Sequence, residues 1–133
     1  MPRILVVDDS LLARESVARI LRREGYATTT APDGKEAWTM LYAGAPDLIV
    51  LDLMMPHMSG LTFLRMLRQH HHWHDVPVLI LTGHADQEQM LKQARALGVA
   101  DFIFKGTFAI DQLLACVHNL VPIGKQQREV AFA

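Results

Sequence analysis

The chain has 133 residues, half of them hydrophobic, which is enough for a single domain with an apolar core. Its formal net charge of −1 does not favour direct binding to nucleic acid or to an anionic membrane. One cysteine excludes an internal disulfide framework. No signal peptide is recognisable and no apolar run approaches the ~20 residues of a membrane span, so we expect a cytoplasmic protein.

The first part of the chain alternates strand and helix patterns. Arg3–Val7 is a continuous apolar run, typical of a parallel strand that is covered on both faces. Leu11–Glu24 places its apolar residues on one helical face, and Ser10 can cap that helix. Tyr26–Ala31 is rich in threonine, which predicts an edge strand. A pattern similar to a capping box then begins at Asp33 and predicts a second helix.

The alternation continues through the rest of the chain. Three more short apolar runs predict buried strands, and each is followed by a helical pattern. Ser59 can cap the first of these helices and Asp86 the second, while the third covers residues 110–120 and ends before a proline. The three predicted strands are Leu48–Leu51, Val78–Leu81 and Asp101–Phe104.

Strands that alternate with helices along one chain predict a doubly wound parallel sheet with right-handed crossovers. We expect one domain over residues 1–121, followed by a tail or the start of a linker over residues 122–133. Cys116 lies within the apolar pattern of the last helix, which predicts a buried and unreactive thiol.

Carboxylates follow two of the predicted strands. Asp8 and Asp9 come directly after the first strand, and Asp52 comes after the run Leu48–Leu51. Because the carboxyl ends of parallel strands meet at one edge of the sheet, we expect the three acids to lie close together. Each carboxylate at such short range disfavours the ionisation of the others, and a bound Mg²⁺ commonly offsets this repulsion.

A hydroxyl and an amine are predicted at the same edge. Thr82 follows the strand Val78–Leu81, and Lys105 follows Asp101–Phe104. Each residue alone fits an ordinary role: acids after strands often cap helices, and lysines are usually solvated surface charges. The ordered set of acids, hydroxyl and amine along one sheet edge is what indicates a functional site.

This set resembles the receiver domain of two-component response regulators, in particular the chemotaxis-regulator type. The resemblance covers roughly residues 3 to 120 and includes the stretch from Asp52 through Met54 to Gly60. It implies the flavodoxin-like receiver fold of the α/β class, a doubly wound five-stranded parallel sheet with strand order 2-1-3-4-5 and five flanking helices.

The resemblance also implies a function in phosphorelay signal transduction. A sensor histidine kinase or a histidine phosphotransfer protein would phosphorylate Asp52, the phosphoacceptor. Asp8, Asp9, Asp52 and the backbone carbonyl of Met54 would bind Mg²⁺ or Mn²⁺. The domain would not be an enzyme in the usual sense, since it would catalyse only its own phosphorylation and dephosphorylation.

The output would follow from the phosphate-binding residues. By the same resemblance, Thr82, Gly83 and Lys105 would contact the phosphoryl group, and Phe102 would turn inward when Thr82 moves. The signalling surface would then be the face of the fourth helix, fifth strand and fifth helix, which would meet a target protein or an output domain.

Two positions are predicted to tune the phosphate lifetime, and one departs from the family. Met54 and His84 each lie two residues after a pocket residue and are expected to affect water access. Gly106 stands after Lys105, where the family usually has a proline in a cis peptide, which makes a cis bond very unfavourable here.

The run from His70 to His74 raises a separate metal hypothesis. These two histidines have the i, i+4 spacing that can bind Zn²⁺ if the helix continues through them. The plainer interpretation is a solvated helix end, where imidazolium charge is favourable. Trp38 and Trp73 are predicted to be packing residues.

Three other functions compete with the receiver. A haloacid-dehalogenase-type phosphohydrolase would need a second acid at the position of Met54. A flavodoxin-like nucleotide binder would need a glycine-rich loop directly after Val7, where Asp8 and Asp9 stand. An interaction module of receiver shape that phosphorylation does not regulate would have lost an acid or Lys105. The sequence therefore favours the phosphorylated receiver.

Overall fold

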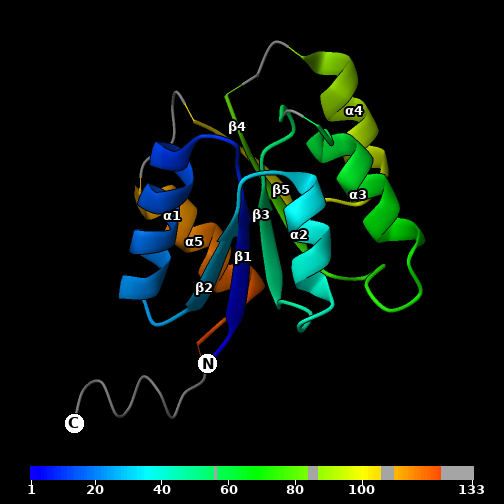
Figure 1. Ribbon diagram of the computed structural model, residues 1–133. Helices are drawn as coiled ribbons and strands as arrows, with labels where there is room; N and C mark the ends of the chain where they lie inside the picture. Colours follow the sequence, from blue (N-terminus) through cyan, green and yellow to red (C-terminus); the bar gives the residue numbers. More distant parts are fainter. Residues whose placement is uncertain (56, 84–86, 106–109, 124–133) are drawn as a thin grey trace, which may run out of the picture.

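The computed structural model describes residues 1–55, 57–83, 87–105 and 110–123. Within these residues, five parallel strands form one sheet in the order β2-β1-β3-β4-β5 (Figure 1), which confirms the predicted fold class. The elements in chain order are β1 (Arg3–Val7), α1 (Leu11–Arg23), β2 (Ala27–Ala31), α2 (Gly34–Leu41), β3 (Leu48–Leu51), α3 (Gly60–Gln69), β4 (Val78–Thr82), α4 (Glu88–Ala96), β5 (Asp101–Phe104) and α5 (Ile110–Leu120).

Helices cover both faces of the sheet, with α1 and α5 on one side and α2, α3 and α4 on the other (Figure 1). Ile4 and Val6 of β1 pack into the first layer, and Leu5 and Val7 pack into the second, because successive side chains of a strand point to opposite faces. Burial on both faces explains the continuous apolar runs. None of the helices in the described ranges combines the length and the apolar composition that crossing a lipid bilayer requires.

Three helices begin at the caps that the sequence predicts. The side chains of Ser10, Asp33 and Ser59 each accept a hydrogen bond from the backbone N–H three residues later, which satisfies a donor that the first helical turn leaves open. For α4, Gln87 occupies the N-cap position and makes no capping hydrogen bond with its side chain. The predicted cap of that helix, Asp86, lies outside the described residues.

The boundaries of two strands differ from the prediction by one residue. The edge strand β2 begins at Ala27, because the N–H of Tyr26 donates to the carbonyl of Leu21 in α1 at 3.2 Å. The Tyr26 side chain belongs to the core, with 1% of its surface exposed. The Tyr26 hydroxyl donates to the carbonyl of Val121 at 2.7 Å and hydrogen bonds with Nδ1 of His118 at 2.8 Å. At the other end of the sheet, β4 extends through Thr82.

The prediction of a buried thiol is wrong, because Cys116 is only half-buried on α5. Its Sγ lies 3.7 Å from Oδ2 of Asp101 on β5. Partial burial and the neighbouring carboxylate both raise the pKa of the Cys116 thiol. The thiol is therefore held in its less nucleophilic form, as predicted, although its burial is not the whole cause.

The histidine run lies at the end of the sheet where the strands begin. Because α3 ends at Gln69 and His70 has an extended backbone conformation, His70 and His74 do not share a helical turn, and the geometry of the zinc hypothesis is absent. The His70 ring stacks on Trp73 at 4.0 Å between centroids, and Trp38 meets Trp73 edge to face at 5.3 Å. The prediction that both tryptophans are packing residues is confirmed.

Arg68 of α3 joins three segments at this same end of the sheet. Its guanidinium donates to the carbonyls of Leu97 at 2.7 Å, Val76 and Gly98 at 2.8 Å, and His74 at 3.2 Å. A planar guanidinium with five donors is suited to such an arrangement. The contacts tie α3 to the segment before β4 and to the C-terminal end of α4.

Candidate functional site

Three carboxylates meet at the carboxyl edge of the sheet. Asp8, Asp9 and Asp52 each offer an oxygen that lies within 4.8 Å of the other two. Asp8 and Asp52 are 3% and 4% exposed, while Asp9 is open to solvent. Among the described residues this is the one cluster of three or more His, Cys, Asp or Glu side chains with such spacing, so the predicted convergence of the acids is confirmed.

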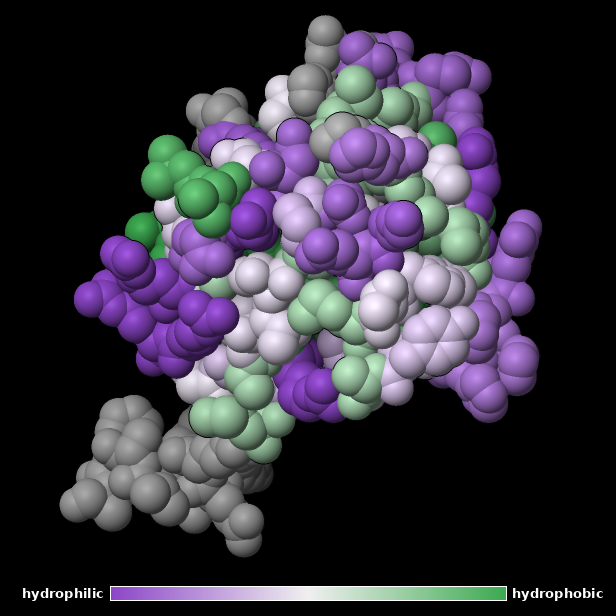
Figure 2. Space-filling view, viewed as in Figure 1, coloured by the Kyte–Doolittle hydropathy of each residue, from purple (hydrophilic) through white to green (hydrophobic). Residues whose placement is uncertain are grey.

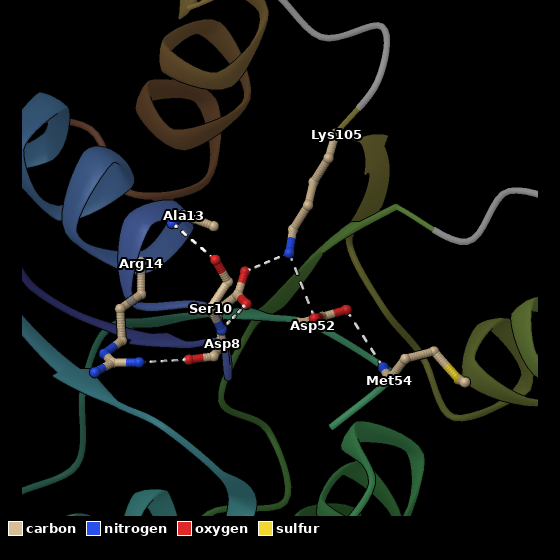
Figure 3. A network of polar contacts seen from close by, with 7 residues as sticks. All are labelled: Asp8, Ser10, Ala13, Arg14, Asp52, Met54 and Lys105. Atoms are coloured by element: carbon tan, nitrogen blue, oxygen red, sulfur yellow. Dashed lines mark hydrogen bonds and ion pairs between the residues drawn. The ribbon is translucent and has the colours of Figure 1, made fainter. Parts of the chain in front are cut away.

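The backbone holds the acids side by side. The N–H of Asp52 donates to the carbonyl of Val7 at 2.9 Å, which carries the contact between β1 and β3 one residue past the end of β3. The N–H of Ser10 donates to Oδ1 of Asp8 at 2.9 Å, and the guanidinium of Arg14 donates to the Asp8 carbonyl at 3.2 Å (Figure 3). The role of Arg14 in holding this loop is not apparent from the sequence.

Lys105 reaches the cluster from the end of β5. Its Nζ lies 2.6 Å from Oδ2 of Asp8 and 3.4 Å from Oδ2 of Asp52, between the two acids (Figure 3). The contact with Asp8 is the shorter of the two. Burial acts to lower the pKa of Lys105, but the two carboxylates outweigh it and leave that pKa above its ordinary value. Lys105 is therefore a firmly charged ammonium.

The surroundings of Asp52 disfavour the charged form of its carboxyl group. Burial raises the pKa of Asp52, Lys105 lowers it and the charge of Asp8 raises it again, with a net shift upward. Two smaller effects favour the carboxylate: a hydrogen bond from the N–H of Met54 at 3.3 Å and one from the Thr82 side chain. The pocket therefore has more negative charge than Lys105 offsets. Clustered carboxylate oxygens are the hard ligands that Mg²⁺ prefers, so the donor set fits that ion.

Two further predicted residues border the pocket. Thr82 is fully buried at the end of β4, next to Asp52 through its hydrogen bond. Among the residues that the structure describes, an added Cβ at Gly83 would meet only the Lys105 side chain, at 4.0 Å, which is an ordinary contact. Steric conflict therefore does not require a glycine at position 83, and the space beside it is open toward the Lys105 stem.

Phe102 is half-buried on β5 and lies apart from the acids. It pairs in register with Ile80, while Thr82 pairs with Phe104, so Phe102 and Thr82 share the face of the sheet that α4 covers. The guanidinium carbon of Arg95 on α4 lies 5.0 Å from the centre of the Phe102 ring.

Gly60 is a residue of the site whose role the sequence does not give. A Cβ at Gly60 would lie 2.1 Å from the carbonyl oxygen of Asp52 and 2.6 Å from Cα of Leu53, distances that no side chain can occupy. The Gly60 N–H also donates to the Leu53 carbonyl at 2.9 Å. The start of α3 thus packs directly on the backbone that carries Asp52.

An apolar patch lies beside the pocket. Leu11 and Leu12 open α1, directly after the acids and Ser10, and are 63% and 79% exposed. Figure 2 shows this hydrophobic patch over the N-terminal part of α1. The sequence pattern places both leucines in the helix, but it does not predict that they are exposed to solvent.

Of the two residues predicted to tune the phosphate lifetime, the structure describes Met54 and not His84. Met54 follows Asp52 closely, with 37% of its surface exposed, and its backbone N–H holds Asp52. His84 lies outside the described residues, as does Gly106. Their roles stay predictions.

The fold is the doubly wound flavodoxin-like one, with acids, a hydroxyl and a lysine gathered where the strands end, as in the receivers of bacterial signalling. Residues 4–118 match the family model of the response regulator receiver domain. The chain belongs to this family and is a receiver domain of the two-component type.

Relatives and solved structures agree with this assignment. The chain is 40% identical over 119 residues to the response regulator MprA of Mycolicibacterium vanbaalenii, across 90% of this chain and 50% of that protein. It therefore spans about half the length of that relative. The chemotaxis protein CheY4 of Vibrio cholerae is 30% identical with a TM-score of 0.82, across 91% of this chain and 99% of that one. The Thermotoga maritima response regulator TrrA, solved in complex with Mg²⁺ and BeF, is 33% identical with a TM-score of 0.79, across 91% and 100%.

Proposed function

We propose that Asp52 accepts a phosphoryl group from a sensor histidine kinase or a histidine phosphotransfer protein, and that Asp8 and Asp9 hold Mg²⁺ for the transfer. The observation that carries this proposal is the burial of Asp52 beside Asp8 and Lys105, where its charge is only partly offset. The Mg²⁺–BeF complex of TrrA supports it, since that relative binds a metal and a beryllium fluoride.

In the transfer, an oxygen of Asp52 bonds to phosphorus while the bond between phosphorus and the donor's histidine nitrogen breaks. Bound Mg²⁺, or Mn²⁺ in its place, supplies positive charge to the phosphoryl oxygens as the transition state develops. Asp8, Asp9 and Asp52 would hold the ion through carboxylate oxygens, with the Met54 carbonyl as a further ligand.

Lys105 then has two successive tasks. It lies between Asp8 and Asp52 before transfer, and its long stem lets the ammonium shift to a phosphoryl oxygen afterwards. The Thr82 hydroxyl donates to another phosphoryl oxygen, and the open space beside Gly83 admits the group. Phe102 moves inward as Thr82 moves, which changes the surface formed by α4, β5 and α5.

Two surfaces receive partners in this proposal. The exposed Leu11 and Leu12 lie next to the acids, so the phosphodonor protein packs on them. The surface of α4, β5 and α5 contacts a target or an output domain. Residues 1–121 form the receiver, and residues 122–133 form a tail or the start of a linker. The domain acts in the cytoplasm and hydrolyses its own phosphoryl group, with no other substrate.

The residues of the pocket argue against the competing functions. A phosphohydrolase of the haloacid-dehalogenase type would place an acid where Met54 stands. An interaction module that phosphorylation does not regulate has no reason to retain both the acid cluster and Lys105 in contact.

The test is incubation of the protein with acetyl phosphate and Mg²⁺, followed by intact-mass measurement. We expect one added phosphoryl group on the wild type, none on Asp52→Asn, and none when EDTA removes the metal. The proposal is wrong if the wild type gains no mass or if Asp52→Asn gains as much.

A further inference from the structure

Arg95 and Phe102 form a contact that the phosphorylation site itself does not explain. The guanidinium carbon of Arg95, in the last turn of α4, lies 5.0 Å from the centre of the Phe102 ring. A guanidinium over an aromatic face at this distance is attracted by the electron density of the ring. Arg95 is exposed and Phe102 is half-buried, so the contact lies at the molecular surface.

In the proposed function the Phe102 ring has two positions, an outer one and an inner one toward Thr82. Phe102 is diagonal to Thr82 on the face that α4 covers, where cross-strand neighbours are within reach of an aromatic side chain. Thr82 is fully buried and hydrogen bonds with Asp52. The half-buried ring lies under Arg95, and we take this as the outer position.

The helix that carries Arg95 is fixed near this residue. Arg68 of α3 donates to the carbonyls of Leu97 and Gly98 at 2.7 and 2.8 Å, and Arg65 of α3 hydrogen bonds with the side chain of Gln93. The C-terminal part of α4 is thus held against α3 on both sides of Arg95. The backbone that carries Arg95 is therefore anchored, with its guanidinium over the ring.

We propose that Arg95 restrains Phe102 in the outward position and thereby opposes the phosphorylated state of the domain. Inward movement of the ring breaks the contact with Arg95. Phosphorylation must therefore supply the free energy that this contact contributes to the outward state. Once released, the Arg95 guanidinium presents a free cation on the surface of α4 and β5, where partners bind. This inference rests on the proposed function of Asp52 and names a residue that regulates it.

The size of the effect follows from the strength of the contact. Cation–aromatic contacts at exposed sites are weak, so loss of this one shifts the balance between the two states by about two- to fivefold. A ligand that prefers the inward state binds more tightly by the same factor. Removal of Arg95 therefore strengthens the binding of a phosphate analogue.

The experiment measures the binding of beryllium fluoride in the presence of Mg²⁺ by NMR titration of the full chain. We expect Arg95→Met to lower the dissociation constant about two- to fivefold, and Arg95→Lys to lie close to the wild type. Lys92→Met is the matched control, because Lys92 is an exposed cation on the same helix. It should leave the dissociation constant unchanged.

A double-mutant cycle separates the contact from a general effect of charge. In the background of Phe102→Leu, which has no ring, Arg95→Met should have no further effect. In the wild type, the ring-current shift of the Arg95 side-chain protons should disappear as beryllium fluoride binds.

Three results would overturn the inference: Arg95→Met that binds like the wild type, Lys92→Met with an equal effect, or an Arg95→Met effect that persists without the ring. Failure of the proposed function has a different outcome, which is no binding to the wild type or equal binding to Asp52→Asn.

Discussion

The two ends of the sheet use charged side chains in opposite ways. Where the strands end, Asp8 and Asp52 are buried around the single ammonium of Lys105, and burial and repulsion raise the pKa of Asp52. Where β4 and β5 begin, the guanidinium of Arg68 donates to four backbone carbonyls. This difference indicates that the first end keeps like charges together at a cost in stability, as a phosphorylation site of the proposed kind would require, while the second end uses charge to hold the fold together.

The largest expected effect is at the end that carries the acids. Gly60→Ala places a Cβ 2.1 Å from the Asp52 carbonyl oxygen, so backbone must move, and we expect a loss of about 3 kcal/mol or more in the free energy of unfolding. Chemical denaturation measures it. Gly83→Ala is the matched control, because within the described part of the chain its Cβ would meet only Lys105, at 4.0 Å. Equal stability of the two variants would contradict the close packing at Gly60.

The next effect is at the opposite end. Arg68→Met removes a guanidinium that satisfies four carbonyls, and we expect a loss of about 2–3 kcal/mol in the free energy of unfolding. The folded variant should still accept a phosphoryl group from acetyl phosphate, since Arg68 is remote from Asp52. Arg19→Met, on the exposed face of α1, should change stability by less than about 0.5 kcal/mol. Equal losses in the two variants would show that the Arg68 contacts do not stabilise the fold.

A smaller effect, of opposite sign, concerns Asp52. Because its pKa in the folded protein is raised, the folded state binds a proton more readily than the unfolded chain, and the contribution of Asp52 to stability falls as pH rises above its ordinary range near 4. At pH 7 without metal, the free energy of unfolding of Asp52→Asn should therefore exceed that of the wild type by about 1 kcal/mol, and its unfolding temperature should be higher by about 4 °C. The gain should shrink toward pH 3.5. Thermal unfolding at several pH values measures it, and a gain that does not depend on pH would contradict the cause.

The smallest effect is kinetic. Met54→Asn and Met54→Glu should change the rate of dephosphorylation by about two- to tenfold, or about 0.4–1.4 kcal/mol in the barrier. The half-exposed Met54 side chain closely follows Asp52, and we expect it to affect the access of water to the phosphoryl group. Both variants should still gain a phosphoryl group. Decay of the phosphoprotein is followed by mass, and an unchanged rate in both variants would exclude a role for Met54.

Much of the fold and the place of the site follow from the sequence. Continuous apolar strands require cover on both faces, and parallel strands bring residues that follow them to one edge. These two rules are sufficient to bring Asp8, Asp9 and Asp52 together. The caps Ser10, Asp33 and Ser59 are equally local, because a short polar side chain and the amide three residues later are enough to define them.

Contacts between distant segments are beyond such rules. The preference of Lys105 for Asp8 over Asp52 depends on how a long side chain lies across two strands. The partners of Arg68 lie up to 30 positions away along the chain, and the close packing of Gly60 on Asp52 depends on the path of the loop between them. The exposure of Cys116 depends on how α5 is turned against β5.

The most direct test of phosphorylation at Asp52 identifies the residue that carries the phosphoryl group. After reaction with acetyl phosphate and Mg²⁺, borohydride reduces an aspartyl phosphate to homoserine, and peptide mass spectrometry locates the change. We expect homoserine at position 52, with Asp8 and Asp9 unchanged and no reduction without Mg²⁺. Reduction at another acid, or none at Asp52 in protein that has gained the phosphoryl mass, would contradict the central role of Asp52.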